Sequence, residues 1–151
     1  DRRFFMCEVD IRELLLSLES SLQPYIQEQG KHFSLHLPAQ LPSVFGNPVK
    51  LKQAFLNLLK NAFEATDEGG CVSLSARKYL DQLIIRITDD GCGMTPETLA
   101  AIFTPFSSGK AGGTGLGLAI TRKIIQAHYG MIEVASTPHR GTTFTITLPH
   151  L

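Results

Sequence analysis

The stretch NPVKLKQAFLNLLKNAFEATDEGG, residues 47–70, predicts the principal helix of the fold. Asn47 is a favourable helix cap, Pro48 suits the first helical position, and the glycines at residues 69–70 stop the helix. Apolar residues recur at helical spacing, and they predict a buried face formed by Leu51, Ala54, Phe55, Leu58, Ala62 and Ala65. A helix with one apolar face needs a second layer to pack against.

The segments around this helix predict that second layer. Residues 72–78 and 83–89 alternate between apolar and polar side chains, which is typical of two strands joined in a hairpin. The other expected elements are a short extended segment and helix over 9–29 ending at Gly30, a strand over 33–37, a loop over 38–45, a short helix over 96–102, a helix over 115–129 closed by Gly130, and strands over 131–136 and 142–148. This order predicts the α+β class, a two-layer α/β sandwich whose mixed, mostly antiparallel sheet is covered by helices on one face.

The composition of the chain disfavours several classes of function. The chain has 151 residues, 14 basic and 14 acidic side chains and a hydrophobic content of 43%, which is typical of one globular domain. A net charge of zero disfavours binding to nucleic acid or to a membrane surface, and no apolar run is long enough to span a bilayer. The first residue is not Met, which suggests a fragment.

The cysteines and histidines carry little functional signal. The three cysteines are odd in number and lack C-x-x-C spacing, so a reducing cytoplasm fits best. The histidines show no spacing typical of metal ligands. His128, beside the expected helix end, is interpreted as a capping or packing residue.

Three polar residues share one stripe of the principal helix. Asn57, Asn61 and Glu64 lie at i, i+4 and i+7, at the border of the apolar face. Amide and carboxylate oxygens at such a border suit a hard cation such as Mg²⁺. A solvated polar face would have the same pattern, so the helix alone leaves both interpretations open.

Asp89 continues the buried row of the strand over 83–89. A buried carboxylate needs a hydrogen-bond donor, which either the protein or the N–H of a ligand can supply. The alternative is a turn-forming Asp ahead of Gly91. Gly91 and Gly93 provide turn conformations or room for the close approach of a ligand.

The glycine-rich stretch GGTGLGL, residues 112–118, leads into a helix. Free backbone N–H groups and the helix dipole at that point favour an anion, with phosphate as the natural candidate. The P-loop and dinucleotide fingerprints are excluded because their required residues are absent. Residues 104–115 lack an apolar period and are expected to form a mobile loop, with Phe103 and Phe106 anchoring it.

Five motifs follow one another along the chain: Asn57-x-x-x-Asn61-Ala62, Asp89-x-Gly91-x-Gly93-Met94, Phe103-x-Pro105-Phe106, Gly113-Thr114-Gly115-Leu116-Gly117-Leu118 and Gly141-Thr142-Thr143-Phe144. In this order they resemble the ATP-binding catalytic domain of a sensor histidine kinase. The same Bergerat-type nucleotide fold occurs in DNA gyrase, in the MutL mismatch-repair protein and in a heat-shock chaperone. The resemblance covers about residues 9–149.

The resemblance implies a set of ligand contacts. Asn61 and Asn57 would hold Mg²⁺ against the phosphates of ATP, and Asp89 would accept the exocyclic amine of adenine. Thr142, on the inward face of its strand in register with Phe144 and Ile146, would reach the adenine edge directly or through water. Residues 104–115 would form a lid. The further nucleotide contacts implied are Gly91, Gly93, Lys110, Gly113, Thr114, Gly115, Leu116, Gly117 and Leu118. Asn57, Asn61 and Lys110 are the implied catalytic residues.

The implied reaction is transfer of the γ-phosphoryl group of MgATP to a histidine on a separate dimerisation and phosphoacceptor domain. A response regulator would be the downstream partner. Residues 1–8 are expected to be a linker from an upstream domain and residues 9–151 the catalytic domain. This domain is expected in the cytoplasm without nucleic-acid or membrane contacts, whether or not the full-length kinase has a membrane anchor.

The role of one residue that differs from the family pattern, and two alternative functions, stay open. Glu64 stands where many members have a basic residue, and the Asn61-Ala62-x-Glu64-Ala65 form resembles the nitrogen-regulatory subgroup. A gyrase-like or MutL-like ATP hydrolase would need a glutamate at Asn57 to activate water, and an amide cannot take that proton. A non-catalytic, nucleotide-gated interaction module would keep the Asp89 site without transferring phosphate.

Overall fold

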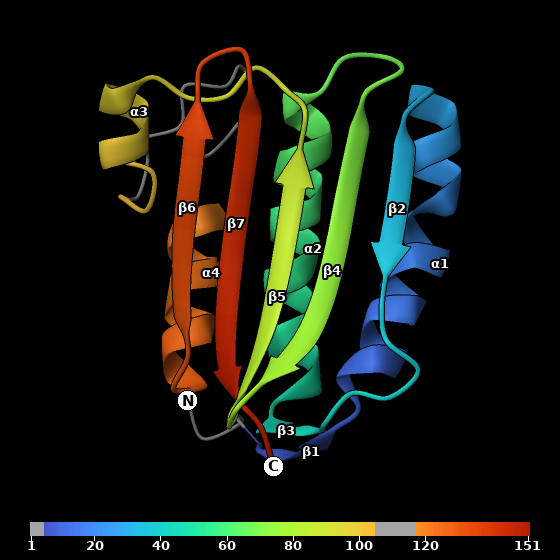
Figure 1. Cartoon of the computed structure of the whole chain (residues 1–151), viewed down its shortest axis with the longest axis vertical. Helices are drawn as coiled ribbons and strands as arrows, with labels where there is room; N and C mark the ends of the chain where they lie inside the picture. Colours follow the sequence, from blue (N-terminus) through green and yellow to red (C-terminus); the bar gives the residue numbers. More distant parts are fainter. Residues whose placement is uncertain (1–4, 105–116) are drawn as a thin grey trace.

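The computed structural model of the chain describes residues 5–104 and 117–151. Along the chain the elements are β1 Cys7–Val9, α1 Ile11–Gln29, β2 His32–His36, β3 Val44–Gly46, α2 Pro48–Ala65, β4 Cys71–Tyr79, β5 Gln82–Asp89, α3 Pro96–Ala100, α4 Gly117–Ala127, β6 Met131–Thr137 and β7 Gly141–Pro149. A five-stranded sheet has the order β2-β4-β5-β7-β6, and β1 pairs with β3 in a separate two-stranded sheet (Figure 1).

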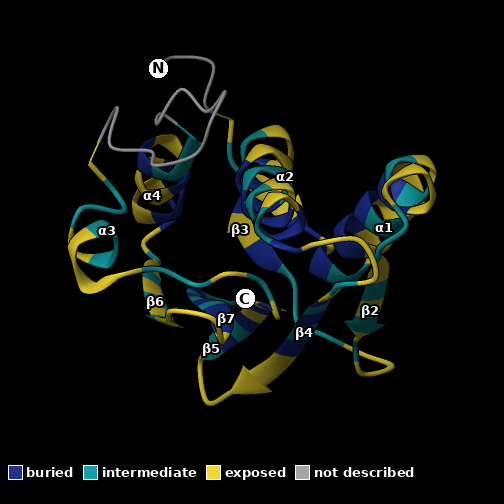
Figure 2. Cartoon of the chain, turned by 90° about the horizontal axis from the view of Figure 1, so that it is seen from above, coloured by how far each residue is buried: buried dark blue, intermediate teal, exposed yellow. Residues whose placement is uncertain are grey.

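The main sheet forms one layer and the helices form the other. β2 pairs with β4 in parallel, whereas the three other pairings are antiparallel. α1, α2 and α4 cover one face of the sheet, and we refer to the opposite face as the outer face (Figure 2). The predicted two-layer sandwich with a mixed, mostly antiparallel sheet is therefore confirmed. Within the described residues, no helix combines the length and the apolar character that a membrane crossing requires.

α2 lies at the centre of the helical layer. Asn47 caps it by accepting the backbone N–H of Lys50 at 2.9 Å, as the sequence predicts. The predicted apolar face is buried except for Ala65, which is half-buried at the end of the helix. Leu59 and Phe63 are buried as well. The ring of Phe63 contacts Tyr25 of α1 and Phe33 of β2, with centroid distances of 6.0 and 5.8 Å, so the apolar face extends further toward α1 than predicted.

The expected loop over residues 38–45 is wrong at its end, because Val44 and Phe45 belong to β3. Val44 is fully buried opposite Val9, and Phe45 is exposed opposite Glu8. A strand of this length contains too little alternation to produce a periodic signal. Its partner strand β1 also lies far away in the sequence.

The end of α4 differs from the expected boundary. The helix ends at Ala127, and residues 115 and 116, the predicted start, lie outside the described residues. Tyr129, not Gly130, adopts the left-handed conformation, with a φ of 62°. A Cβ at Gly130 would lie 2.5 Å from the carbonyl oxygen of Thr147 in β7. Glycine is needed there for close approach to the sheet, not for a left-handed helix cap.

His128 joins the end of α4 to the start of α2. Its Nε2 accepts the backbone N–H of Asn47 at 2.9 Å, and its Nδ1 lies 2.7 Å from the carbonyl oxygen of Ile124. An accepting Nε2 places the proton of the neutral ring on Nδ1, which then donates to Ile124. The side chain is 1% exposed, so the interpretation of His128 as a packing residue is confirmed.

Burial lowers the pKa of His128 below its ordinary value of 6.5, although its hydrogen bond to Ile124 acts in the opposite direction. The unfolded chain therefore binds more protons than the folded chain when the pH falls through 6.5. The contribution of neutral His128 to stability is complete above that value. It is lost progressively as the pH drops toward the folded pKa.

We expect the free energy of unfolding to fall between about pH 8 and about pH 5, and His128→Gln to remove part of that fall. Gln at this position offers an accepting oxygen to Asn47 but does not titrate. Urea denaturation of both proteins at the two pH values measures the difference. An unchanged pH dependence in a folded His128→Gln variant would contradict the role of this histidine.

Candidate functional site

Asp89 and Thr142 face each other across the paired strands β5 and β7. Asp89 is the last residue of β5, and the antiparallel register places it opposite Thr142 near the start of β7. Asp89 is 3% exposed and Thr142 is 5% exposed. Each continues the row of its strand that faces the helices, after Ile87 in β5 and before Phe144 in β7. The predicted inward direction of both side chains is confirmed.

The carboxylate of Asp89 forms a local turn. Its Oδ1 accepts the backbone N–H of Gly91 at 2.9 Å, so the turn-forming interpretation is confirmed. A carboxylate has about four acceptor positions, so this bond uses only part of its capacity. The turn role and a role toward a ligand are therefore compatible.

The loop that follows Asp89 is wedged between the end of α2 and the turn from β6 to β7. The backbone N–H of Cys92 donates to the carbonyl oxygen of Ala65 at 3.1 Å, and the N–H of His139 donates to the carbonyl oxygen of Cys92 at 2.7 Å. A Cβ at Gly91 would lie 2.2 Å from the Ala65 oxygen, and one at Gly93 would lie 2.0 Å from the Thr137 oxygen. The close approach of the protein's own backbone therefore explains why both positions are glycine, without any contact to a ligand.

The asparagines of α2 lie on the flank of the helix that faces α4. The side-chain nitrogen of Asn57 donates to the carbonyl oxygen of Gly117 and to the hydroxyl of Thr121, each at 3.5 Å. Asn61 follows one turn later, and Ala65 one turn after that, beside Cys92. Asn57 and Asn61 are both half-buried. The two asparagines therefore lie on a partly buried flank between the start of α4 and the loop after Asp89, whereas Glu64, the third residue of the predicted stripe, is exposed.

Glu64 has a different environment from the two asparagines. It is exposed, whereas the asparagines are half-buried. Burial, and after it the charge of Glu64, raises the pKa of Tyr25 on α1. The charge of Glu64 therefore reaches α1, whereas Asn57 contacts α4.

Several predicted contacts lie outside the described residues, namely Lys110, Gly113, Thr114, Gly115 and Leu116. Gly117 and Leu118 lie in the first turn of α4, and a Cβ at Gly117 would meet no atom of another described segment within 4 Å. Phe103, at the start of the predicted lid, packs on Phe144 with a centroid distance of 6.5 Å. Phe103 therefore packs on the core as predicted, and Phe106 and the loop that it was expected to anchor lie outside the described residues.

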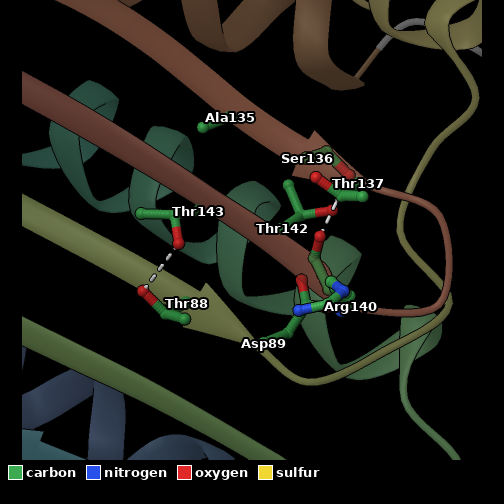
Figure 3. A pocket seen from close by; sticks show the side chains of 9 residues that line it. Thr88, Asp89, Ala135, Ser136, Thr137, Arg140, Thr142 and Thr143 are labelled. Atoms are coloured by element: carbon green, nitrogen blue, oxygen red, sulfur yellow. Dashed lines mark hydrogen bonds between the residues drawn. The ribbon is translucent and has the colours of Figure 1, made fainter.

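Ser136 is a polar residue of this region that the sequence reasoning missed. It follows Ile132 and Val134 in the inward row of β6 and lies opposite Thr142. Its hydroxyl lies 2.8 Å from the hydroxyl of Thr142 (Figure 3). The sequence does contain a signal for Ser136, because its hydroxyl side chain continues an otherwise apolar row of the strand.

A cavity of about 200 Å³ lies at the same end of the sheet (Figure 3). It is lined by Thr88, Asp89, Ala135, Ser136, Thr137, Arg140, Gly141, Thr142 and Thr143. Thr88 and Thr143, whose hydroxyls lie 3.1 Å apart, belong to the outer face. The cavity therefore reaches Asp89 and Thr142 from the side opposite α2.

The half-buried asparagines of α2 supply amide oxygens, which are donors that suit a hard metal ion. In the part of the chain that the structure describes, no group of three or more His, Cys, Asp or Glu could hold a metal ion. Mg²⁺ takes few protein ligands and completes its shell with water and phosphate oxygens. The side-chain nitrogen of Asn57 is the atom that contacts α4, and its amide oxygen is of the kind that suits such a metal ion.

Residues 46–151 match the model of a protein family described as histidine kinase-, DNA gyrase B-, and HSP90-like ATPase. The chain is similar to the sensor histidine kinase ZraS of Escherichia coli K12, with 43% identity over 144 residues. This alignment covers 93% of the chain and 30% of ZraS. Sporulation kinase B of Bacillus subtilis is 44% identical over 107 residues, which cover 70% of the chain and 25% of that kinase. The chain thus spans less than a third of the length of these relatives.

Solved structures of histidine kinases have the same fold. The catalytic domain of histidine kinase ThkA superposes with a TM-score of 0.88 and 28% identity, over 97% of this chain and 96% of that domain. Full-length ShkA in complex with AMPPNP gives a TM-score of 0.86 and 29% identity, over 98% of this chain and 32% of ShkA. ThkA in complex with the response regulator TrrA gives 0.85 and 26%, over all of this chain and 43% of ThkA.

Proposed function

Because the chain belongs to the family of histidine kinase-, DNA gyrase B- and HSP90-like ATPases, we propose that it is the ATP-binding catalytic domain of a sensor histidine kinase. It binds MgATP and donates the γ-phosphoryl group to a histidine on a separate dimerisation and phosphoacceptor domain. Residues 9–151 form this catalytic domain, and residues 1–8, of which Cys7 and Glu8 pair with β3 as the start of β1, are the linker to an upstream domain. The observation that carries the proposal is the buried pair of Asp89 and Thr142, at the strand ends beside the α2 asparagines.

The adenine base is proposed to lie on the helix side of the sheet, at the ends of β5 and β7. Asp89 accepts the exocyclic amine, and Thr142 contacts the ring edge directly or through water. Both side chains are almost completely buried, so they offer directional contacts in a dry environment. Gly91 and Gly93 hold the loop that borders the base.

The phosphates are proposed to extend from this point along the flank of α2 toward α4. Asn61 and Asn57 ligate Mg²⁺ through their amide oxygens, and the metal neutralises phosphate charge during transfer. The N-terminal turn of α4, with Gly117 and Leu118, offers backbone N–H groups to an anion. Lys110 and residues 113–116 complete the phosphate contacts, and residues 104–115 form the lid.

The partners are proposed on the same basis. The acceptor histidine lies on the dimerisation domain of the same kinase, and a response regulator acts downstream, as the ThkA–TrrA complex suggests. This domain is placed in the cytoplasm, without contacts to membrane or nucleic acid. The Asn61-Ala62-x-Glu64-Ala65 form supports a nitrogen-regulatory-like subgroup, with Glu64 in place of the basic residue that is frequent there.

Asp89→Asn should weaken MgATP binding about ten- to hundred-fold, because a buried acceptor is replaced by a mismatched amide. Asp90→Asn is the matched control. It makes the same charge change at the next residue, whose carboxylate accepts the N–H of Cys71. Calorimetric titration with MgATP and MgGTP measures both variants. Unchanged ATP affinity in folded Asp89→Asn would remove this residue from the site.

Asn61→Ala should abolish the dependence of nucleotide affinity on Mg²⁺ while the adenosine contacts persist, because the metal loses a protein ligand. Gln53→Ala, an exposed change on the same helix, is the control. The measurement is the thermal shift with ADP in the presence and absence of Mg²⁺. Full metal-dependent stabilisation of Asn61→Ala would favour the alternative of a polar helix face.

The chain alone should bind MgATP but neither hydrolyse it quickly nor label itself, since Asn57 supplies no general base. Transfer should appear when the acceptor domain is supplied in trans, because its imidazole then approaches the γ-phosphate in line. The assay uses γ-labelled ATP, followed by an acid-lability test for phosphohistidine.

Two outcomes of this assay would contradict the proposal. Brisk phosphate release by the isolated chain would favour the ATP hydrolase. Binding without any transfer to the native acceptor domain would favour the non-catalytic, nucleotide-gated module.

A further inference from the structure

Ser136 connects three chain segments at the buried end of the sheet. Its hydroxyl oxygen lies 2.8 Å from the backbone nitrogen of Met94 and 3.0 Å from the carbonyl oxygen of Gly141. It also lies 2.8 Å from the hydroxyl of Thr142 (Figure 3). Met94 belongs to the loop after Asp89 and Gly141 starts β7. A single side chain therefore contacts both segments that carry the proposed adenine contacts.

The direction of each hydrogen bond follows from counting protons. The N–H of Met94 can only donate, and the carbonyl oxygen of Gly141 can only accept. Ser136 has one hydroxyl proton, which it donates to Gly141. Its contact with Thr142 is then a hydrogen bond only if Thr142 is the donor. This is the assignment in which all three contacts are hydrogen bonds.

This assignment determines which hydrogen bonds the side chain of Thr142 can still form. Its only hydroxyl proton is directed at Ser136, so its oxygen offers only lone pairs to any other group. Asp89 lies opposite on β5, and a carboxylate likewise accepts hydrogen bonds without donating them. Two acceptors thus lie next to each other on the row that faces the helices.

We propose that Ser136 is a positioning residue that directs the Thr142 hydroxyl and thereby makes the site select a 6-aminopurine over a 6-oxopurine. The inference rests on the proposed function, in which these strand ends hold the base. A 6-amino group has two N–H donors, and it can donate one to Asp89 and one to Thr142. An oxo group at the same place puts an oxygen opposite lone pairs, which leaves buried polar groups unpaired.

Two roles of Ser136 predict different binding data. If Ser136 only tethers the loop through Met94, its loss weakens the binding of 6-aminopurine and 6-oxopurine nucleotides by the same factor. If it directs Thr142, its loss frees the threonine hydroxyl to rotate and donate to an oxo group. The ratio of the two affinities then changes, and this ratio is the informative quantity.

The experiment compares MgATP with MgITP, whose base has an oxo group at position 6 and a proton on N1, by calorimetric titration of the 151-residue chain. We expect Ser136→Ala to reduce the preference for ATP about tenfold. Ser136→Thr, which retains a hydroxyl, should restore the preference. If Ser136→Ala does not fold, Ser136→Cys keeps the volume of the side chain with a much weaker acceptor and takes its place.

A double-mutant cycle tests whether Ser136 acts through Thr142. In a Thr142→Val background, Ser136→Ala should leave the ATP to ITP ratio unchanged. A ratio that changes equally in both backgrounds, or one that Ser136→Ala never changes, would overturn the inference while the proposed function stands. A wild-type chain that binds neither nucleotide would overturn the proposed function and this inference with it.

Discussion

The antiparallel register between β5 and β7 is the constraint on which the candidate site depends. It pairs Gln82 with Pro149 at one end and Asp89 with Thr142 at the other. Because side chains alternate along a strand, a shift of either strand by one residue would turn its polar side chain to the outer face. Gly141 permits the close approach of the strands at this point, since a Cβ there would lie 2.0 Å from the carbonyl oxygen of Asp89.

Polar contacts then place the helices relative to that strand end. Asn57 joins α2 to the first turn of α4, and His128 joins the end of α4 to the cap of α2. At the other end of α2, Ala65 accepts the N–H of Cys92 in the loop after Asp89. α2 is therefore held at both ends, and its asparagine flank lies between α4 and that loop. Local packing and hydrogen bonding thus bring the proposed metal ligands near the proposed base contacts.

Features with a clear period or a local cap were predictable from the sequence. The position of α2 follows from its cap Asn47 and from helical spacing. The hairpin of β4 and β5 and the inward direction of Asp89 and Thr142 follow from alternation along the strands. Features that depend on distant partners were not predictable. β3 is too short to show a recognisable alternation in the sequence. The burial of Phe63 depends on α1 and β2, and the three contacts of Ser136 come from separate segments.

The central claim is that an adenine nucleotide binds on the helix side of the strand ends, beside α2. Backbone and side-chain amide NMR spectra, recorded while a non-hydrolysable MgATP analogue is added, test it most directly. The account predicts shifts at Gly91 and Thr142 and at the side-chain amides of Asn57 and Asn61, with little change at Ala135 and Arg140 of the outer cavity. Shifts concentrated at Ala135, Thr137 and Arg140, with the asparagine amides unchanged, would contradict it.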